Sequence, residues 1–342
     1  MQLLKRREKN KRFHDKRCKK LCKNRNRKKK RTHNANYRPN KSKRILLSAP
    51  PDLRIFDQTT EAVEFFNYII DVIKHCAVKS VLYFDLSKVE VITPDAVMYL
   101  IAIIKNTKRL RMLEIRCEGN MPINEDARLV FQQAGFFKFV YAHFRDKIKE
   151  DTKYMKIENG KNADSITASS FCDFVQSTFQ KTHMHTKRLF PMIVELMTNT
   201  YQHAYRNDNG WDGLTEMNTN WYIFAQDVGN AIRFIFLDTG VGIPRTVARR
   251  NRERIANWFN LDNDVIYLES VLKGDYSRSE TGLLHRGKGL PEIYNDCKNG
   301  YISNLRIISG KAKCIVNADS TISANRTDAV FKGTLFSWEI IK

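Results

Sequence analysis

The chain has 342 residues, of which 42% are apolar, so it is long enough for about two folded domains with buried cores. Its net charge of +22 is concentrated at one end: residues 1–44 contain 21 Lys and Arg against two acidic residues, and 22 minus 19 leaves +3 for the rest of the chain. The longest apolar run, residues 96–104, is too short to span a bilayer, and seven scattered cysteines argue against a disulfide framework.

The first predicted segment, residues 1–44, is a polybasic arm. Its like charges repel and its only aromatic residues are Phe13 and Tyr37, so we expect it to be disordered on its own. Lys and Arg in such a segment most simply neutralise phosphates, which makes nucleic acid the expected partner of the arm. The alternatives are an anionic membrane surface, which favours an apolar face that this segment lacks, and a nuclear-import signal in a eukaryotic host.

The location that we expect is the cytoplasm. The basic N-terminus is not followed by the apolar stretch of a secretory signal peptide. An odd number of cysteines spread over the chain fits a reducing compartment. We therefore expect a soluble, cytoplasmic protein that has no membrane partner.

Residues 45–148 alternate short apolar strands with amphipathic helices, which predicts an α/β domain. Strands are predicted at residues 45–48, 53–56, 80–86 and 113–117, and helices at residues 61–77, from residue 93 onward, and at residues 124–134. Gly135 ends the last of these helices. Thr93 is the predicted N-cap of the middle helix, and Pro94 occupies its first position.

This pattern resembles the STAS domain, the anti-sigma-factor-antagonist fold, over nearly the whole segment. At the start of its second helix that family has an Asp-Ser-Ser-Gly stretch with a phosphorylatable serine, whereas this chain has Thr93-Pro94-Asp95-Ala96. Proline has no hydroxyl group. The resemblance therefore implies a regulatory domain with a protein partner, in which the phosphorylation switch is absent or displaced onto Thr93, a residue that helix capping already explains.

Residues 149–164 are polar and contain Gly160, which predicts a linker or an irregular strand. Residues 165–342 form the second predicted domain. It begins with a helix at residues 165–180 and continues with a helix that contains Glu195 and Asn199. Strands are predicted in two pairs, at residues 222–225 with 232–237 and at residues 301–309 with 313–316, and a last strand is predicted at residues 334–341.

Three short motifs in this second domain contain residues suited to a nucleotide. Glu195 and Asn199 are four residues apart, so a carboxylate and an amide share one face of their helix. Asp238 ends a buried strand and is followed by Gly240, Gly242 and Ile243. The third motif is Arg286-Gly287-Lys288-Gly289-Leu290, which precedes a helix, and Lys332-Gly333-Thr334 stands before the final strand.

Each motif has a chemical rationale. The Asp238 carboxylate can accept a hydrogen bond from the exocyclic amine of adenine, where guanine has a carbonyl, and this selects ATP over GTP. The glycines at 240 and 242 allow the backbone to approach the base closely. N–H groups of residues 286–290 can point at phosphates, with added charge from Arg286 and Lys288. Asn199 can offer its amide oxygen to Mg²⁺.

In this order the motifs resemble the N, G1 and G2 boxes of the GHKL or Bergerat-fold ATPases, the family of gyrase, the mismatch-repair ATPases, histidine kinases and the anti-sigma-factor kinases. The resemblance covers roughly residues 165–342. It implies that Asn199 is the magnesium residue, that Glu195 is the general base, and that the stretch between Pro244 and Arg286 is the mobile lid, with arginines from Arg245 to Arg254. No phosphoacceptor-histidine helix is evident, so the resemblance is closer to anti-sigma-type and other stand-alone members than to sensor kinases.

The site residues follow from these motifs. Glu195 is the predicted catalytic residue and Asn199 the predicted metal ligand. The predicted nucleotide-binding residues are Asn199, Asp238, Gly240, Gly242, Ile243, Arg286, Gly287, Lys288, Gly289, Leu290 and Thr334.

The sequence therefore predicts an α/β protein with a STAS-like domain at residues 45–148, a linker at residues 149–164, and a GHKL domain at residues 165–342 whose mixed sheet has helices on one face. We expect magnesium-dependent ATP binding with slow hydrolysis, in which the state of the lid is coupled to the STAS-like domain. The alternatives are a protein Ser/Thr kinase of anti-sigma type that acts on a partner, and an ATP-gated binding protein that does not hydrolyse ATP.

Overall fold

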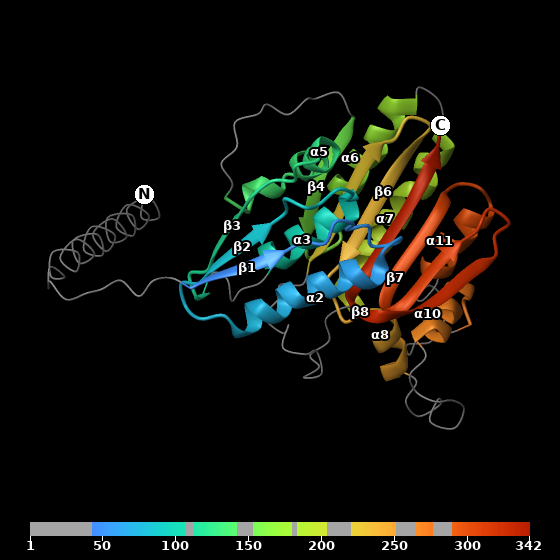
Figure 1. Cartoon of the computed structure of the whole chain (residues 1–342). Coiled ribbons are helices and arrows are strands. Elements are labelled where there is room, and N and C mark those ends of the chain that lie inside the picture. Colours follow the sequence, from blue (N-terminus) through green and yellow to red (C-terminus); the bar gives the residue numbers. More distant parts are fainter. Residues whose placement is uncertain are drawn as a thin grey trace, which may run out of the picture. The chain divides into compact units, whose positions relative to one another are not determined.

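The computed structural model of the chain describes residues 43–106, 112–141, 153–179, 183–203, 220–250, 264–275 and 289–342 (Figure 1). The polybasic arm lies outside the described residues except for Lys43 and Arg44. Residues 43–342 form one compact unit. The fold is α/β, with one parallel sheet and one antiparallel sheet.

The N-terminal half is built on three parallel strands in the order β1 (Arg44–Ser48), β2 (Val81–Asp85) and β3 (Arg116–Gly119). Parallel neighbours require crossover connections, and α2 (Thr59–His75) and α3 (Pro94–Asn106) provide them. They are followed by α5 (Glu125–Gln133), whose N-cap is Asn124: its side chain accepts a hydrogen bond from the Ala127 N–H at 3.0 Å. The predicted alternation of strands and helices is confirmed.

One predicted strand of this half, at residues 53–56, is wrong. The segment forms a turn before α2. Arg54 folds back onto Asp52, to which both its backbone N–H and its guanidinium donate, and it also pairs with Asp57 at 3.2 Å. These local ion pairs hold the chain in a turn, so the apolar side chains of the segment are buried without forming a ladder.

The second sheet has five strands in the order β4-β5-β6-β8-β7, and every neighbouring pair is antiparallel. The strands are β4 (Tyr154–Gly160), β5 (Trp221–Asp227), β6 (Ala231–Asp238), β7 (Ser303–Val316) and β8 (Ile322–Ile341). The expected mixed sheet is thus corrected to an antiparallel one, because β5 to β6 and β7 to β8 are joined by hairpins. For residues 149–164 the sequence predicted either a linker or an irregular strand. The structure has a strand there, β4, at the edge of the sheet.

The predicted hairpin between residues 301–309 and 313–316 is also wrong, because both belong to the single long strand β7. The chain reverses later, between β7 and β8. There the Asn317 N–H donates to the Thr321 carbonyl at 2.9 Å, and the Asp319 side chain accepts from the Thr321 N–H at 2.9 Å. Asp319 and Ser320 are residue types that favour turns, because their side chains can hydrogen-bond to nearby backbone groups.

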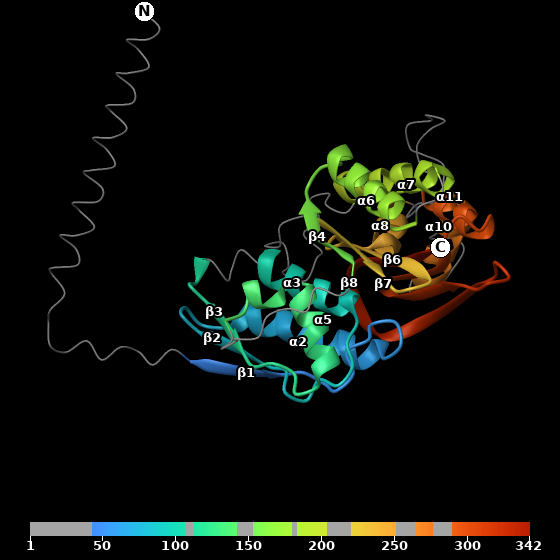
Figure 2. The ribbon, with the colours of Figure 1, turned by 90° about the horizontal axis from the view of Figure 1, so that it is seen from above.

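Helices cover both faces of the five-stranded sheet (Figure 2). One face packs against α6 (Ser165–Phe179), α7 (His183–His203), α10 (Asp264–Lys273) and α11 (Gly289–Lys298). The other face packs against α2 and α3 of the N-terminal half. The prediction had helices on one face of this sheet, and the structure adds the N-terminal half on the second.

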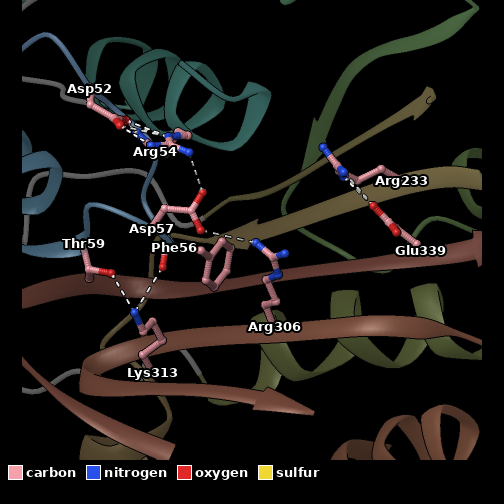
Figure 3. A network of polar contacts seen from close by, with 9 residues as sticks. All are labelled: Asp52, Arg54, Phe56, Asp57, Thr59, Arg233, Arg306, Lys313 and Glu339. Carbon is pink, nitrogen blue, oxygen red and sulfur yellow. Dashed lines mark hydrogen bonds and ion pairs between the residues drawn. The ribbon is translucent and has the colours of Figure 1, made fainter. Parts of the chain in front are cut away.

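The two halves therefore share one hydrophobic core. Residues of the five-stranded sheet that join α2 and α3 in this core are Tyr222, Phe224, Ile235, Leu237, Ile308, Phe331 and Leu335. Polar contacts link the halves beside it (Figure 3): Lys313 Nζ donates to the Phe56 carbonyl at 3.1 Å and to Thr59 Oγ1 at 3.3 Å, and Arg306 lies 3.8 Å from Asp57. Among the helices that the structure describes, none is long and apolar enough to cross a membrane.

Candidate functional site

The candidate site begins on α7, where Glu195 and Asn199 lie one turn apart. The opposite side of the helix is apolar and buried against the five-stranded sheet; its residues are Leu189, Met192, Ile193, Leu196 and Met197. This packing leaves Glu195 and Asn199 half-buried at the edge of the helix layer. The Asn199 amide hydrogen-bonds to the Glu195 carboxylate, so the two polar groups share one face of the helix.

Gly289, from the third motif, lies directly against Glu195. It is the first residue of α11 and is buried. A Cβ atom at this position would collide with Cγ and the carboxyl group of Glu195, so any larger residue here would force the Glu195 side chain to move. The first and third motifs, which are far apart in the sequence, therefore meet in the structure.

The surroundings of Glu195 change its acidity. Burial raises the pKa of Glu195 above the ordinary 4.5, and the negative charge of Glu292 raises it further, while the hydrogen bond from Asn199 acts in the opposite direction. Glu292 is one turn beyond Gly289 on α11, so the same helix that packs on Glu195 also supplies this charge. A raised pKa brings a carboxylate closer to what a general base requires near neutral pH.

Asp238 is the last residue of β6 and faces Thr334 of β8 across the ladder. Its Oδ1 accepts a hydrogen bond from the Gly240 N–H at 2.8 Å. Burial raises the pKa of Asp238 to about 6, although hydrogen bonds from Gly240 and Thr334 favour the charged form. Removing a charged carboxylate from water costs free energy unless partners compensate for it. Asp238 is therefore a candidate functional residue.

Ser309 of β7 ties the second motif to the final strand. Its hydroxyl accepts a hydrogen bond from the Ile243 N–H at 2.9 Å and donates to the Gly333 carbonyl at 2.9 Å. Thr334 Oγ1 lies 3.1 Å away, and Gly242 packs against the same hydroxyl. The turn after β6 and the start of the last strand segment are thus held together by one buried side chain.

Strand alternation places these residues on the face of the five-stranded sheet that α6, α7, α10 and α11 cover. Phe234 and Phe236 of β6 pack against α6 and α7, so Asp238, two residues further, lies on the same side. By the same rule Thr334 shares the side of Phe336, and Ser309 shares that of Ile307. The Asp238 group and the Glu195 group therefore lie on one face of the five-stranded sheet.

The structure describes only some of the remaining predicted site and lid residues. Leu290 follows Gly289 in α11 and packs, half-buried, on the core beneath α7. Arg286, Gly287 and Lys288 lie outside the described residues. Of the predicted lid, the structure describes α8 (Ile243–Arg250), on which Arg245 is exposed, and α10.

Two residues of this region were missed by the sequence analysis. Ser309 had a weak signal, as a polar residue between the apolar pair Ile307–Ile308 and Gly310. Glu292 had none, because a single glutamate in the first turn of a helix is ordinary. Its effect on Glu195 depends on the packing of α11 against α7, which only the structure provides.

A second candidate position is the start of α3, where the STAS resemblance would put a phosphoacceptor. The Thr93 carbonyl accepts the first helical hydrogen bonds, from Ala96 at 3.1 Å and Val97 at 3.3 Å. The helix begins at Pro94, so Thr93 holds the predicted N-cap position, although its buried hydroxyl accepts no hydrogen bond from a helix N–H of the described residues. Burial raises the pKa of Asp95, although the neighbouring Thr93 hydroxyl and, to a smaller extent, the charges of Arg233 and Arg306 oppose this.

This geometry predicts that the N-terminal half is not phosphorylated at that position. A phosphate on Thr93 would place about two negative charges in an enclosed space beside Asp95, a residue that is itself 6% exposed. Incubation of the protein with Mg-ATP followed by intact-mass measurement should show no added phosphate on residues 45–148. A phosphopeptide that contains Thr93 would contradict the prediction and would favour the kinase alternative.

Comparisons with known proteins give no independent identification. No protein-family model matches the chain, and no curated protein sequence matches it.

Proposed function

We propose that the chain is a magnesium-dependent ATP-binding protein of GHKL type that hydrolyses ATP slowly. The observation that supports this best is the contact between Glu195 and Gly289, since the N and G2 motifs are expected to face one nucleotide and their residues touch. Support also comes from the partly buried Asp238, held by Gly240 and Thr334 on the same side of the sheet.

In the proposed site each group has one task. Asp238 accepts a hydrogen bond from the adenine amine and thereby selects ATP over GTP. The first turn of α11 presents backbone N–H groups to the phosphates, and the sequence supplies positive charge immediately before this turn, at Arg286 and Lys288. Glu195 takes a proton from the attacking water, a role that its raised pKa supports.

The donor set also fits magnesium. Mg²⁺ prefers hard oxygen ligands and is commonly held by one or two protein groups together with substrate phosphates and water. Asn199 would supply the amide oxygen, and its side chain is only half-buried. The ion, when bound, would neutralise charge on the phosphates.

Labelled nucleotide separates this proposal from its two alternatives. With γ-labelled ATP, release of free phosphate indicates an ATPase, transfer of label to a protein indicates a Ser/Thr kinase of anti-sigma type, and binding without either indicates an ATP-gated binding protein. We expect slow release of free phosphate. The protein partner that the STAS resemblance implies would be sought among proteins that co-purify with the chain from native cells, with and without nuclease.

We also propose that the polybasic arm binds nucleic acid. If residues 1–44 contact about 6 to 10 phosphates of a duplex, affinity should fall by roughly 10³ to 10⁵ between 50 and 200 mM salt, through loss of the counterion-release contribution. Deletion of residues 1–42, which leaves β1 intact, should abolish this binding and leave ATP turnover unchanged.

The measurement is a salt titration of nucleic-acid binding by the full-length and truncated proteins side by side. Equal affinity and equal salt slope in the two proteins would rule out the arm as the binding element and would turn attention to the arginines from Arg245 to Arg254.

A further inference from the structure

The ladder between β7 and β8 is interrupted where β8 reaches the proposed site. Ser309 pairs with Thr334, but its neighbour Gly310 pairs with Phe331. Lys332 and Gly333 are therefore extra residues on β8, which makes them a β-bulge. Bulges of this kind re-aim backbone and side chains, and they are common beside functional sites.

The two carbonyls of the bulge are held from two different directions. The Gly333 carbonyl accepts a hydrogen bond from Ser309, within the proposed nucleotide site, at 2.9 Å. The Lys332 carbonyl accepts one from the hydroxyl of Tyr99 at 2.8 Å. Tyr99 belongs to α3, so the N-terminal half holds one side of the bulge.

Tyr99 is fixed by its own surroundings. It is 2% exposed, its ring stacks on Phe331 with centroids 4.6 Å apart, and its edge meets Phe66 of α2 at 5.0 Å. A second contact from α2 lies beside it, since Asn67 Nδ2 donates to the Val330 carbonyl at 3.0 Å. Two helices of the N-terminal half, α2 and α3, thus contact β8 immediately before the bulge.

The bulge in turn touches the residue proposed to recognise adenine. Gly333 has a φ of 118°, which favours glycine, and a Cβ atom there would collide with the carbonyl oxygen of Asp238. A shift of the bulge would therefore move the end of β6 and Thr334 together. The chain of contacts runs from Tyr99 through Lys332 and Gly333 to Asp238.

From these contacts we propose that Tyr99 is a positioning residue for the nucleotide site, so that the N-terminal half is a structural part of this site. The proposal rests on the ATP-binding function proposed above. Since coupling between two sites is reciprocal, nucleotide that fixes Asp238 and Thr334 also stabilises the contact of the bulge with α3. The state of the nucleotide site is thereby communicated to the STAS-like half through the sheet itself.

The variant Tyr99→Phe tests this with little disturbance, because it keeps both ring contacts and removes only the hydroxyl group. The matched control is Tyr68→Phe on α2, where the tyrosine is 50% exposed. Affinity for a non-hydrolysable ATP analogue with magnesium is measured by calorimetry at a temperature at which all three proteins are folded. We expect the dissociation constant to rise about 3- to 10-fold in Tyr99→Phe, the range that one hydrogen bond allows, and to stay unchanged in the control.

A purely structural role of Tyr99 gives a different result. It would lower the midpoint of thermal unfolding and leave the dissociation constant of the folded protein unchanged, and that outcome would overturn the proposal. Hydrogen exchange without nucleotide provides the second measurement: Tyr99→Phe should speed exchange at Gly240 and Ile243, whose N–H groups are bonded within the site.

The exchange measurement also separates this inference from the ATP proposal. If the wild-type protein does not bind the analogue, the ATP-binding function fails, and the positioning role of Tyr99 is then decided by exchange alone. Unchanged exchange at residues 238–243 in Tyr99→Phe would overturn the inference even if the wild-type protein binds ATP.

Discussion

Replacing Glu195 with glutamine is expected to leave ATP binding intact and to lower turnover by about 10² to 10⁴, the range for loss of a general base. Glutamine keeps the shape that packs against Gly289 but cannot accept a proton. Asn199→Ala is expected to weaken binding of the magnesium nucleotide by at least about tenfold, or 1.4 kcal/mol, because the metal loses a ligand.

Calorimetry with a non-hydrolysable analogue and a phosphate-release assay distinguish the two variants. Glu64→Gln on α2 and Asn299→Ala after α11 are matched controls, since both residues are exposed and distant from the site in the fold. Turnover of the wild-type protein should fall as pH drops through the raised pKa of Glu195, because the base becomes protonated. Normal turnover in Glu195→Gln would remove the ATPase proposal.

Asp238→Asn is expected to stabilise the fold while it weakens ATP binding. The amide presents a donor toward the adenine amine, so binding loses its recognition contact. Stability changes in the opposite direction because the pKa of Asp238, ordinarily 3.8, is raised to about 6 in the folded protein. The difference corresponds to on the order of 3 kcal/mol for holding the charged form at pH well above 6.

The sign of this effect follows from proton binding. Between pH 3.8 and about 6 the folded protein keeps a proton on Asp238 that the unfolded chain has lost, so stability falls as pH rises through this window. Asparagine does not titrate, so the variant does not lose stability in this window. The difference in free energy of unfolding between Asp238→Asn and the wild-type protein should therefore grow from pH 4 to pH 6 and then remain constant.

Asp227, the last residue of β5, gives the matched control for Asp238→Asn. Burial alone would raise the pKa of Asp227, but the hydrogen bonds from Lys342 and Gly229 and the charge of Lys342 hold it below the ordinary value. Asp227→Asn should therefore destabilise the fold slightly at neutral pH and leave ATP affinity unchanged. Equal effects of the two substitutions on stability would contradict the account of Asp238.

Local patterns in the sequence were sufficient for most elements. Apolar periodicity and the stop signal at Gly135 predicted most helices and strands of the N-terminal half, because these signals act within a few residues. The turn at Arg54 was not predicted, since the apolar residues around it are also typical of a strand and the ion pairs of Arg54 with Asp52 and Asp57 leave no signal in that pattern. The predicted turn at residues 310–312 lies inside β7, where the register shifts opposite the bulge of β8.

The sequence of β5 contains a signal that both faces of the five-stranded sheet are buried. Residues 221–225 of β5 are all apolar and all buried, and a strand that is covered on one face alone alternates apolar with polar residues. This run indicated that a second layer covers the sheet. That the layer is α2 and α3 could not be derived, because such packing depends on contacts between distant residues.

In the candidate site too, features that depend on local sequence were predicted and features that depend on tertiary packing were not. The spacing of Glu195 and Asn199 predicted their shared face, because helix geometry is local. That the first and third motifs belong to one site was implied by family resemblance alone, and the contact of Gly289 with Glu195 was not predicted. Ser309 and Tyr99 could not be assigned from the sequence, since each acts through a contact made by tertiary packing.

The most direct test of the central claim is calorimetric titration of the full chain with a non-hydrolysable ATP analogue in magnesium, beside the corresponding GTP analogue and the variant Gly289→Ala. The account predicts that ATP binds at one site per chain, that GTP binds more weakly, and that the added methyl group displaces Glu195 and weakens ATP binding. Absence of ATP binding to the folded wild-type protein at millimolar concentration would contradict it.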